Sequence, residues 1–240
     1  MNTQLSPPQV AWLLHRRRRH RRQAGSNLWF HFRANDLAGG QGFSVPSIPD
    51  SNGGSVVLNS PSGGTPPVIF ANALPNGQKA LFFNPSTGVN RLDFNQNFLA
   101  TSSTIIVVAN ATNVPLGDQG LVVCANTALY ANLSASFLDH WGCYVKATVQ
   151  SGYSLSNVFK VVILRVNLDA SFDMFDMATK VSIGPQAGSF PGRPGASVGA
   201  DPGGSQQFQG YIAEIYMYTN PLSDTDILAK VSELLTLYGI

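Results

Sequence analysis

The sequence predicts an all-β protein: a two-sheet antiparallel jelly-roll sandwich with a short C-terminal helix and a basic N-terminal arm. Composition is the first reason, because charged residues make up 12% of the chain while Gly and Pro contribute 23 and 15 of its 240 residues. Organisation is the second, since short apolar segments follow one another without the strand–helix alternation that builds a parallel sheet. A chain of this length is sufficient to bury one sandwich core.

Turn-forming residues divide the chain into short segments. Loops are expected where Gly, Pro, Ser and Asn gather, at 39–42, 50–54, 60–67 and 186–204. The run Thr104–Ala109 is continuously apolar, which predicts a strand covered on both faces. The expected strands are Leu28–Phe32, Ala80–Asn84, Thr104–Asn110, Gly120–Ala125, Trp141–Thr148, Val158–Asn167, Phe172–Met177 and Tyr211–Tyr218.

The chain ends with a strand followed directly by a helix. Tyr211–Tyr218 alternates in period two, and Asn220-Pro221 then interrupts the strand. Ser223 is typical of a helix N-cap and Gly239 of a C-cap. Unbroken alternation would place Ile212, Glu214, Tyr216 and Tyr218 on one face of the strand, and Tyr211, Ala213, Ile215 and Met217 on the other. The apolar stripe of the helix would consist of Ile227, Leu228, Val231, Leu234, Leu235 and Tyr238.

Three motifs follow one another along the chain. They are L-W-F-H-F-R-A-N-D-L at 28–37, N-G-Q-K-A-L-F-F at 76–83, and G-Y-I-A-E-I-Y-M-Y-T-N-P-L-S-D at 210–224. The third motif is followed by the expected helix, which closes with Tyr238-Gly239. These motifs resemble those of laminin-G-like (concanavalin A-like) jelly-roll domains, a group with bacterial and bacteriophage members. The resemblance covers residues 27–240 and implies the sandwich fold, whereas function varies widely among such proteins.

Residues 1–26 are expected to form a separate basic arm. Six arginines between Arg16 and Arg22 give this arm a charge of +6, while nine basic and thirteen acidic residues leave the remainder at −4. Apolar residues directly precede the arginines, which favours docking to a partner protein over binding of nucleic acid. A solvated tail without a role is a third alternative. The expected partner-binding residues of the arm are Trp12, Leu13, Leu14, Arg16, Arg17, Arg18, Arg19, Arg21 and Arg22.

The sequence offers no pair of carboxylates for glycoside hydrolysis. Glycosidases on related jelly rolls commonly carry E-x-D-x-x-E, in which one acid protonates and the other attacks. This chain contains two glutamates, Glu214 and Glu233, and neither has such a neighbour. Glu214 is expected to make a structural hydrogen bond or to cap a loop, and Asp169, Asp173 and Asp176 are expected to be solvated carboxylates around a turn. We therefore predict that the protein is not an enzyme.

No cofactor is predicted. Some members of the resembling group hold calcium at the sandwich rim, so Asp93, Asp118 and Asp201 define a weaker calcium alternative, although no dense acidic loop accompanies them. Cys124 and Cys143 have no metal-ligand neighbours at zinc spacing. Reduced, buried thiols are favoured over a disulfide, because the N-terminus lacks the pattern of a secretion signal.

Glycan binding stays open because the fold implied by the resemblance includes lectins. The aromatic candidates for sugar stacking are Tyr130, Trp141, Tyr153 and Phe190, although core or loop packing is the simpler interpretation of each. No segment of 18 or more apolar residues is present, so no contact with a membrane is predicted.

The favoured hypothesis is a non-enzymatic virion structural protein, made in the host cytoplasm. It would be a capsid decoration, head-fibre or tail component that is anchored by its arm to capsid or tail protein subunits and displays a lectin-like domain to host glycans. A homo-oligomer is compatible with this hypothesis. The alternatives are a capsid or nucleoid protein whose arm binds nucleic acid, and a free glycan-binding lectin.

Overall fold

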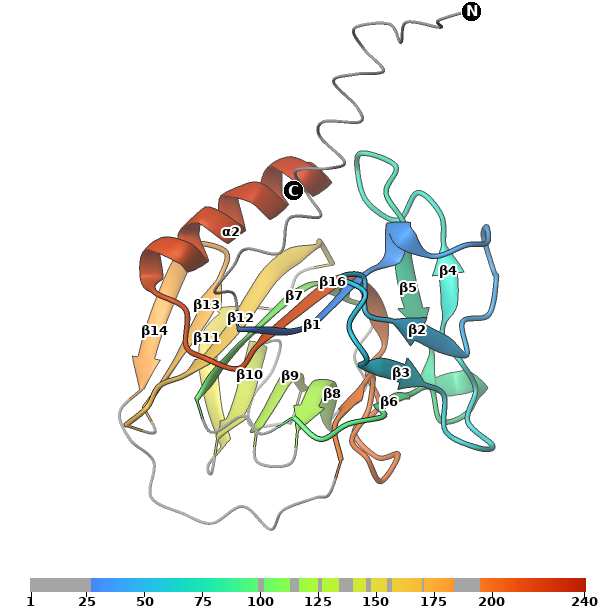
Figure 1. Cartoon of the computed structure of the whole chain (residues 1–240), viewed down its shortest axis with the longest axis horizontal. Helices are drawn as coiled ribbons and strands as arrows, with labels where there is room; N and C mark the ends of the chain where they lie inside the picture. Colours follow the sequence, from blue (N-terminus) through green and yellow to red (C-terminus); the bar gives the residue numbers. More distant parts are fainter. Residues whose placement is uncertain are drawn as a thin grey trace, which may run out of the picture.

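The chain folds into two stacked β-sheets, with one helix against the outer face of one sheet (Figure 1). All strand pairs that the structure describes are antiparallel, so the predicted fold class is confirmed. A computed structural model describes residues 27–98, 102–112, 117–124, 127–133, 140–145, 148–154, 157–169, 171–183 and 195–240. Within these residues, no helix has the length and apolar character needed to cross a membrane.

Sheet A has eight strands in the order β14-β13-β12-β7-β16-β5-β4, and β1 pairs with β16 beside β5. Its strands are β1 (Leu28–Arg33), β4 (Val68–Phe70), β5 (Ala80–Phe83), β7 (Ser103–Ala111), β12 (Lys160–Val166), β13 (Phe172–Asp176), β14 (Thr179–Ile183) and β16 (Gly210–Tyr218). Strand β7 is buried along its whole length, as its continuous apolar sequence predicts.

Sheet B also has eight strands, in the order β11-β10-β9-β8-β15-β6-β3-β2. Its strands are β2 (Ser47–Pro49), β3 (Val57–Asn59), β6 (Leu92–Phe94), β8 (Gly117–Cys124), β9 (Thr127–Leu133), β10 (His140–Val145), β11 (Thr148–Ser154) and β15 (Ser197–Val198). Two short 3₁₀ helices, η1 (Ala34–Asp36) and η2 (Pro85–Thr87), connect strands. Aromatic and aliphatic side chains from both sheets form the main core between them.

Two predicted segments differ from the structure. The strand expected at Trp141–Thr148 is instead the end of β10 and the start of β11, which pair as neighbours in sheet B. The sequence between them lacks the Gly, Pro or Asn that normally marks a turn. The loop expected at 186–204 contains β15, a two-residue strand that pairs with both β6 and β8.

Strand β16 contains a β-bulge that the alternating sequence does not reveal. Ile212 lies opposite Ala109 of β7 and Glu214 lies opposite Val108, so Ala213 is the extra residue. The predicted faces are therefore wrong for the residues before the bulge. Ile212, Ile215 and Met217 enter the main core, whereas Tyr211, Ala213, Tyr216 and Tyr218 pack on the outer face.

Helix α2 (Asp224–Tyr238) follows the predicted start and end signals. The Ser223 hydroxyl accepts a hydrogen bond from the Asp226 amide at 3.1 Å, and Gly239 takes the left-handed conformation at φ 67°. Leu228 is 44% exposed, so its predicted place in the apolar stripe is wrong. The buried face of α2 consists of Ile227, Val231, Leu234 and Tyr238, which pack on the outer face of sheet A.

Candidate functional site

Four aromatic rings gather on the outer face of sheet A, and we call them the aromatic patch. They are Phe70 of β4, Phe82 of β5, Tyr211 of β16 and Phe159, which directly precedes β12. The Phe82 and Tyr211 ring centroids are 4.8 Å apart and their planes are inclined by 32°. Phe70 meets Tyr211 edge-on at 5.2 Å. In Figure 1, α2 runs along the β12–β14 side of the sheet, while β4 and β5 lie on the opposite side of the view.

Strand register places the aromatic patch on one face. Phe82 lies directly between Val68 of β4 and Tyr211 of β16, and Tyr211 in turn lies opposite Asn110 of β7. Residues opposite one another in an antiparallel pair point to the same face of the sheet. The intervening residues Ile69, Leu81, Phe83, Ala109, Ala111 and Ile212 are buried in the main core on the inner face. Phe70, Phe82 and Tyr211 are left partly exposed.

Asn110 lies in this row with its amide oxygen unsatisfied. Its side chain is 8% exposed, and within the described structure its Oδ1 has no hydrogen-bond partner. A buried polar atom without a partner costs free energy, on the order of 1–3 kcal/mol. Such atoms are uncommon in folded proteins, and this one lies in the same row as two partly exposed rings, Phe82 and Tyr211.

A second feature of the outer face is the fully buried carboxylate of Glu214. Its Oε1 lies 2.7 Å from His31 Nε2 and accepts a 2.6 Å hydrogen bond from the Tyr216 hydroxyl. The Arg33 Nε donates to the same oxygen at 3.0 Å, and the Tyr238 hydroxyl donates to Oε2 at 2.5 Å. The carboxylate therefore joins β1, β16 and the last turn of α2, which confirms the predicted structural hydrogen bonding of Glu214.

The surroundings of Glu214 keep it ionised. Burial by itself raises the pKa of this carboxyl, but the hydrogen bond from His31 and the charge of Arg33 outweigh burial, and the pKa falls to about 2. Burial and the adjacent carboxylate raise the pKa of the Tyr216 and Tyr238 hydroxyls. Both tyrosines are therefore neutral donors to an anionic acceptor at neutral pH.

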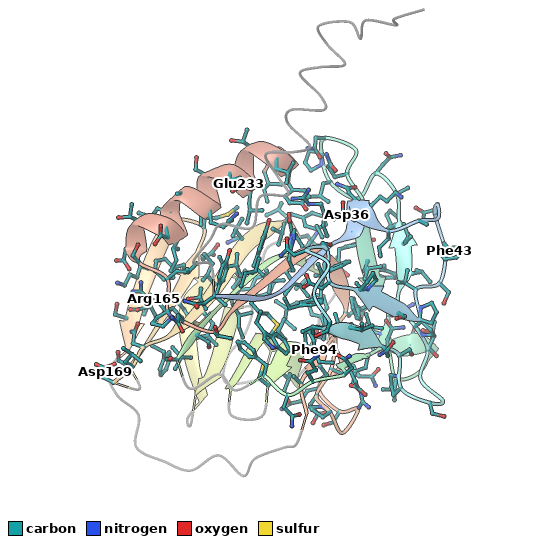
Figure 2. The ribbon with its side chains drawn as sticks, viewed as in Figure 1. Asp36, Phe43, Phe94, Arg165, Asp169 and Glu233 are labelled. Carbon is teal, nitrogen blue, oxygen red and sulfur yellow. The ribbon has the colours of Figure 1, made fainter. Side chains whose placement is uncertain are left out.

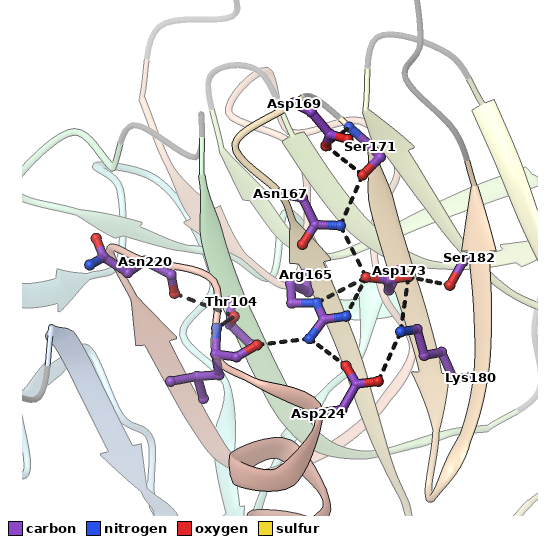
Figure 3. A network of polar contacts seen from close by, with 11 residues as sticks. Thr104, Arg165, Asn167, Asp169, Ser171, Asp173, Lys180, Ser182, Asn220 and Asp224 are labelled. Carbon is purple, nitrogen blue, oxygen red and sulfur yellow. Dashed lines mark hydrogen bonds and ion pairs between the residues drawn. The ribbon is translucent and has the colours of Figure 1, made fainter.

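A third feature is a polar network at the start of α2 (Figure 3). Arg165 of β12 donates from Nε and a terminal nitrogen to Asp173 Oδ2 of β13, at 2.9 and 2.6 Å. Its other terminal nitrogen lies 2.6 Å from Asp224 Oδ1 and donates to the Leu222 carbonyl at 2.8 Å. Lys180 of β14 pairs with Asp224 Oδ2 at 3.0 Å. The network thus fastens the first turn of α2 to three adjacent strands.

The prediction of solvated aspartates is wrong for two of three residues. Asp173 and Asp176 are 4% and 7% exposed, because they lie within β13 and pair with Arg165 and Lys160. Burial raises the pKa of Asp173, but hydrogen bonds from Ser182 and neighbouring donors outweigh it and lower the pKa. Asp169 is exposed in the turn before β13, as predicted.

Comparison with known proteins gives similarity of fold. No family model matches the sequence, and no curated protein sequence matches it. Domain 4 of an extracellular arabinanase from Geobacillus stearothermophilus, solved with arabinotriose, superposes with a TM-score of 0.55 at 11% identity, over 85% of this chain and 98% of that domain. The receptor-binding domain of botulinum neurotoxin type G superposes with a TM-score of 0.55 at 9% identity, over 80% of this chain and 51% of that one.

The chain has the fold of a two-sheet antiparallel β-sandwich. A sialidase from Trypanosoma rangeli also superposes, with a TM-score of 0.54 at 12% identity, over 93% of this chain. The chain spans 38% of the sialidase and 51% of the toxin domain. At these identities the likeness concerns the fold, and the site has to be argued from the residues of this chain.

The predicted glycan-binding residues are not brought together by the described structure. Trp141 of β10 is fully buried in the main core, which corrects its prediction because a sugar ring cannot stack on a side chain without exposed surface. The side chains of Tyr130 and Tyr153, and Phe190 as a whole, lie outside the described residues. The arm residues from Trp12 to Arg22 also lie outside them, so both predictions stay predictions.

The predicted calcium ligands have protein partners where they are described. Asp93 Oδ1 lies 2.7 Å from Arg91 Nε, and the fully buried Asp201 accepts a 2.7 Å hydrogen bond from Ser205. The side chain of Asp118 is not among those described. In the part of the chain that the structure describes, no three His, Cys, Asp or Glu side chains are grouped to hold a metal ion.

Cys124 is a free thiol in the main core, and burial raises its pKa to about 12. A reduced, buried thiol is therefore confirmed for this residue. The side chain of Cys143 lies outside the described residues.

Sequence reasoning missed the aromatic patch. Strand β4 was not predicted, because its three residues follow Pro66-Pro67 in a segment rich in turn residues. The outward position of Phe82 follows from period-two alternation, but that of Tyr211 depends on the bulge at Ala213. The proximity of the two rings depends on β5 pairing with β16, more than 120 residues apart. A phenylalanine or tyrosine at an outward strand position was the available signal.

Proposed function

We propose that this protein binds glycans and that the aromatic patch is its ligand-binding surface. The observation that carries the proposal is the unsatisfied amide oxygen of Asn110 beside the partly exposed rings of Phe82 and Tyr211. Aromatic rings supply flat apolar area for the C–H face of a sugar, and an amide supplies directional hydrogen bonds to its hydroxyls. The similarity of the fold to an arabinanase domain solved with arabinotriose supports the proposal.

Simple packing of the rings against the sheet explains the aromatic patch less completely than ligand binding does. Rings placed simply to cover the core would be favoured by burial alone, and no polar group would be needed beside them. The row instead keeps a buried amide oxygen without a partner, at a cost in stability, next to rings that retain exposed surface. Positions that sacrifice stability in this way are frequently functional.

The test is glycan binding by the full-length protein, first on an array of oligosaccharides and then by calorimetry on the best binder. We expect Phe82→Thr and Tyr211→Thr each to weaken binding about tenfold, since threonine preserves the strand but removes the ring. Leu168→Thr is the control, because Leu168 is 86% exposed at a turn remote from the aromatic patch. Absence of glycan binding, or wild-type affinity in both patch variants, would contradict the proposal.

A second proposal concerns the arm. We propose that residues 1–26 fasten the protein to a larger assembly, a virion capsid or tail, from which the sandwich is displayed to host glycans. The supporting observation is the sequence itself: Trp12, Leu13 and Leu14 are separated from six arginines by His15 alone, a combination of apolar anchors and cations suited to a groove with an acidic rim.

Deletion of residues 1–26 is expected to leave the unfolding midpoint of the sandwich unchanged and to abolish incorporation into particles. Electron microscopy and particle composition measure incorporation, and Trp12→Ser separates the two interpretations of the arm. Protein docking should be lost with Trp12→Ser, because the charge is retained but the anchor is removed. Binding to nucleic acid would survive that substitution and would weaken steeply with salt, which would favour the nucleoid alternative.

A further inference from the structure

We infer that the aromatic patch takes an uncharged oligosaccharide, which lies across β4, β5, β16 and β7 and is hydrogen-bonded by Asn110. This inference rests on the proposed glycan-binding function and specifies its ligand. Three properties of the row carry it: the charge of the surrounding segments, the length of the row and the state of the Asn110 amide.

The segments that build the aromatic patch contain no charged residue. None occurs in 66–73, 80–90, 105–112, 157–159 or 207–213, which supply the four rings, Val68 and Asn110. Lys160, which directly follows Phe159, pairs with Asp176 at 2.6 Å. Elsewhere on sheet A the described cations are engaged, as Arg33 is with Glu214 and Arg165 with Asp173. A carboxylate or sulfate on a sugar would lose its hydration at this surface without gaining a cationic partner. The site therefore selects against acidic sugars.

The row is longer than one sugar ring. Val68, Phe82, Tyr211 and Asn110 occupy successive positions on four adjacent strands. With strands spaced by about 4.8 Å, the row extends about 14 Å across the sheet. Phe70 extends the ring surface along β4, and Phe159 lies 6.1 Å from Tyr211 at the β12 side. A ligand that uses the whole row is a chain of linked sugars, not a single terminal residue.

Asn110 supplies the polar recognition. It stands beside Tyr211 with its Oδ1 unsatisfied, and the neighbouring ring side chains Phe82 and Phe70 offer no hydrogen-bonding group. Replacing this asparagine by leucine removes the unsatisfied group without a large change of volume. If Asn110 has only a structural role, that change would leave ligand affinity unaltered. If Asn110 hydrogen-bonds the ligand, the substitution should raise stability and lower affinity.

The experiment uses the full-length protein with length-matched neutral and acidic oligosaccharides and their monosaccharides. We expect neutral oligosaccharides to bind, with an affinity that is independent of salt and at least about tenfold higher than for the monosaccharide. Asn110→Leu should raise the melting temperature and lower affinity about tenfold. Asn59→Leu, at an exposed position of β3 in the other sheet, is the control: Asn59 Oδ1 accepts one exposed hydrogen bond from Ser47, so the substitution should leave affinity unchanged and should not raise the melting temperature.

The outcomes separate this inference from the function on which it rests. Preference for acidic glycans, binding that weakens with salt, or wild-type affinity of Asn110→Leu would overturn the inference while glycan binding itself stands. Failure of every glycan to bind would overturn the proposed function as well. A dimer that dissociates with Phe82→Thr, in a protein that binds no sugar, would assign the aromatic patch to a contact between two copies of the chain.

Discussion

Replacing Glu214 by glutamine is expected to lower the free energy of unfolding by about 3 kcal/mol. The side chain is fully buried and receives donors from His31, Arg33, Tyr216 and Tyr238. Glutamine preserves the shape but removes the charge that balances Arg33, and its NH₂ group is directed at donors instead of acceptors. The substitution would weaken the attachment of β1, β16 and α2 to one another, because the carboxylate connects all three.

The chain supplies a matched control in Glu233, its other glutamate. Glu233 lies on the outward side of α2, where its carboxylate is 54% exposed and pairs with Lys230 at 2.8 Å (Figure 2). The same substitution there should change the unfolding free energy by less than about 0.5 kcal/mol, since exposed ion pairs contribute little. Urea unfolding of the two variants and the wild type measures both effects.

The pH dependence of stability tests the contribution of the Glu214 carboxylate independently. The folded-state pKa of Glu214 is about 2, below its ordinary value of 4.5, so the carboxylate stabilises the fold above pH 4.5 and this contribution disappears as pH falls toward 2. The difference in unfolding free energy between wild type and Glu214→Gln should therefore shrink over that range. Equal stability of the two proteins at neutral pH, or a difference that does not vary with pH, would show that Glu214 does not act as a buried anion.

The fold class was predictable because it depends on local properties of the chain. Low charge, frequent Gly and Pro, and short apolar segments indicate strands and turns, whichever strands later pair with one another. The helix was equally predictable, since the N-cap Ser223 and the C-cap Gly239 each bond to residues within one helical turn. Strands of two or three residues, such as β4 and β15, were missed because pairing with neighbours stabilises them more than their own sequence does.

The candidate site was less predictable because it arises from register. Phe82 and Tyr211 are brought together by a pairing of distant strands, and the bulge at Ala213 reverses the faces that simple alternation assigns within β16. The aspartates show the same limit. Asp173 resembles a turn residue in the sequence, but the arginine that makes its burial tolerable lies on the neighbouring strand.

The second large effect is expected at Asp173. Asp173→Asn should lower the unfolding free energy by about 3 kcal/mol, because it removes the buried charge that faces Arg165, 7% exposed, and Lys180. If the asparagine oxygen keeps the bonds from Arg165, its NH₂ group faces the Ser182 hydroxyl and the Lys180 cation, which are donors to the carboxylate. Asp169→Asn is the control four residues earlier in the same network: Asp169 is exposed at the turn, and the asparagine oxygen still accepts from Ser171. That control should leave the unfolding midpoint unchanged.

Replacing both Arg165 and Asp173 tests whether their ion pair stabilises the sheet or fixes the position of α2. Arg165→Met combined with Asp173→Leu removes both charges and fills the space with apolar atoms, so we expect it to recover most of the stability lost in Asp173→Asn. Arg165 also holds Asp224 and the Leu222 carbonyl, which place the first turn of α2. If the double variant unfolds at the wild-type midpoint but exchanges the amides of that turn faster, the charges serve to fix the position of α2 and contribute little net stability. If it is as unstable as Asp173→Asn, the ion pair itself stabilises the sheet.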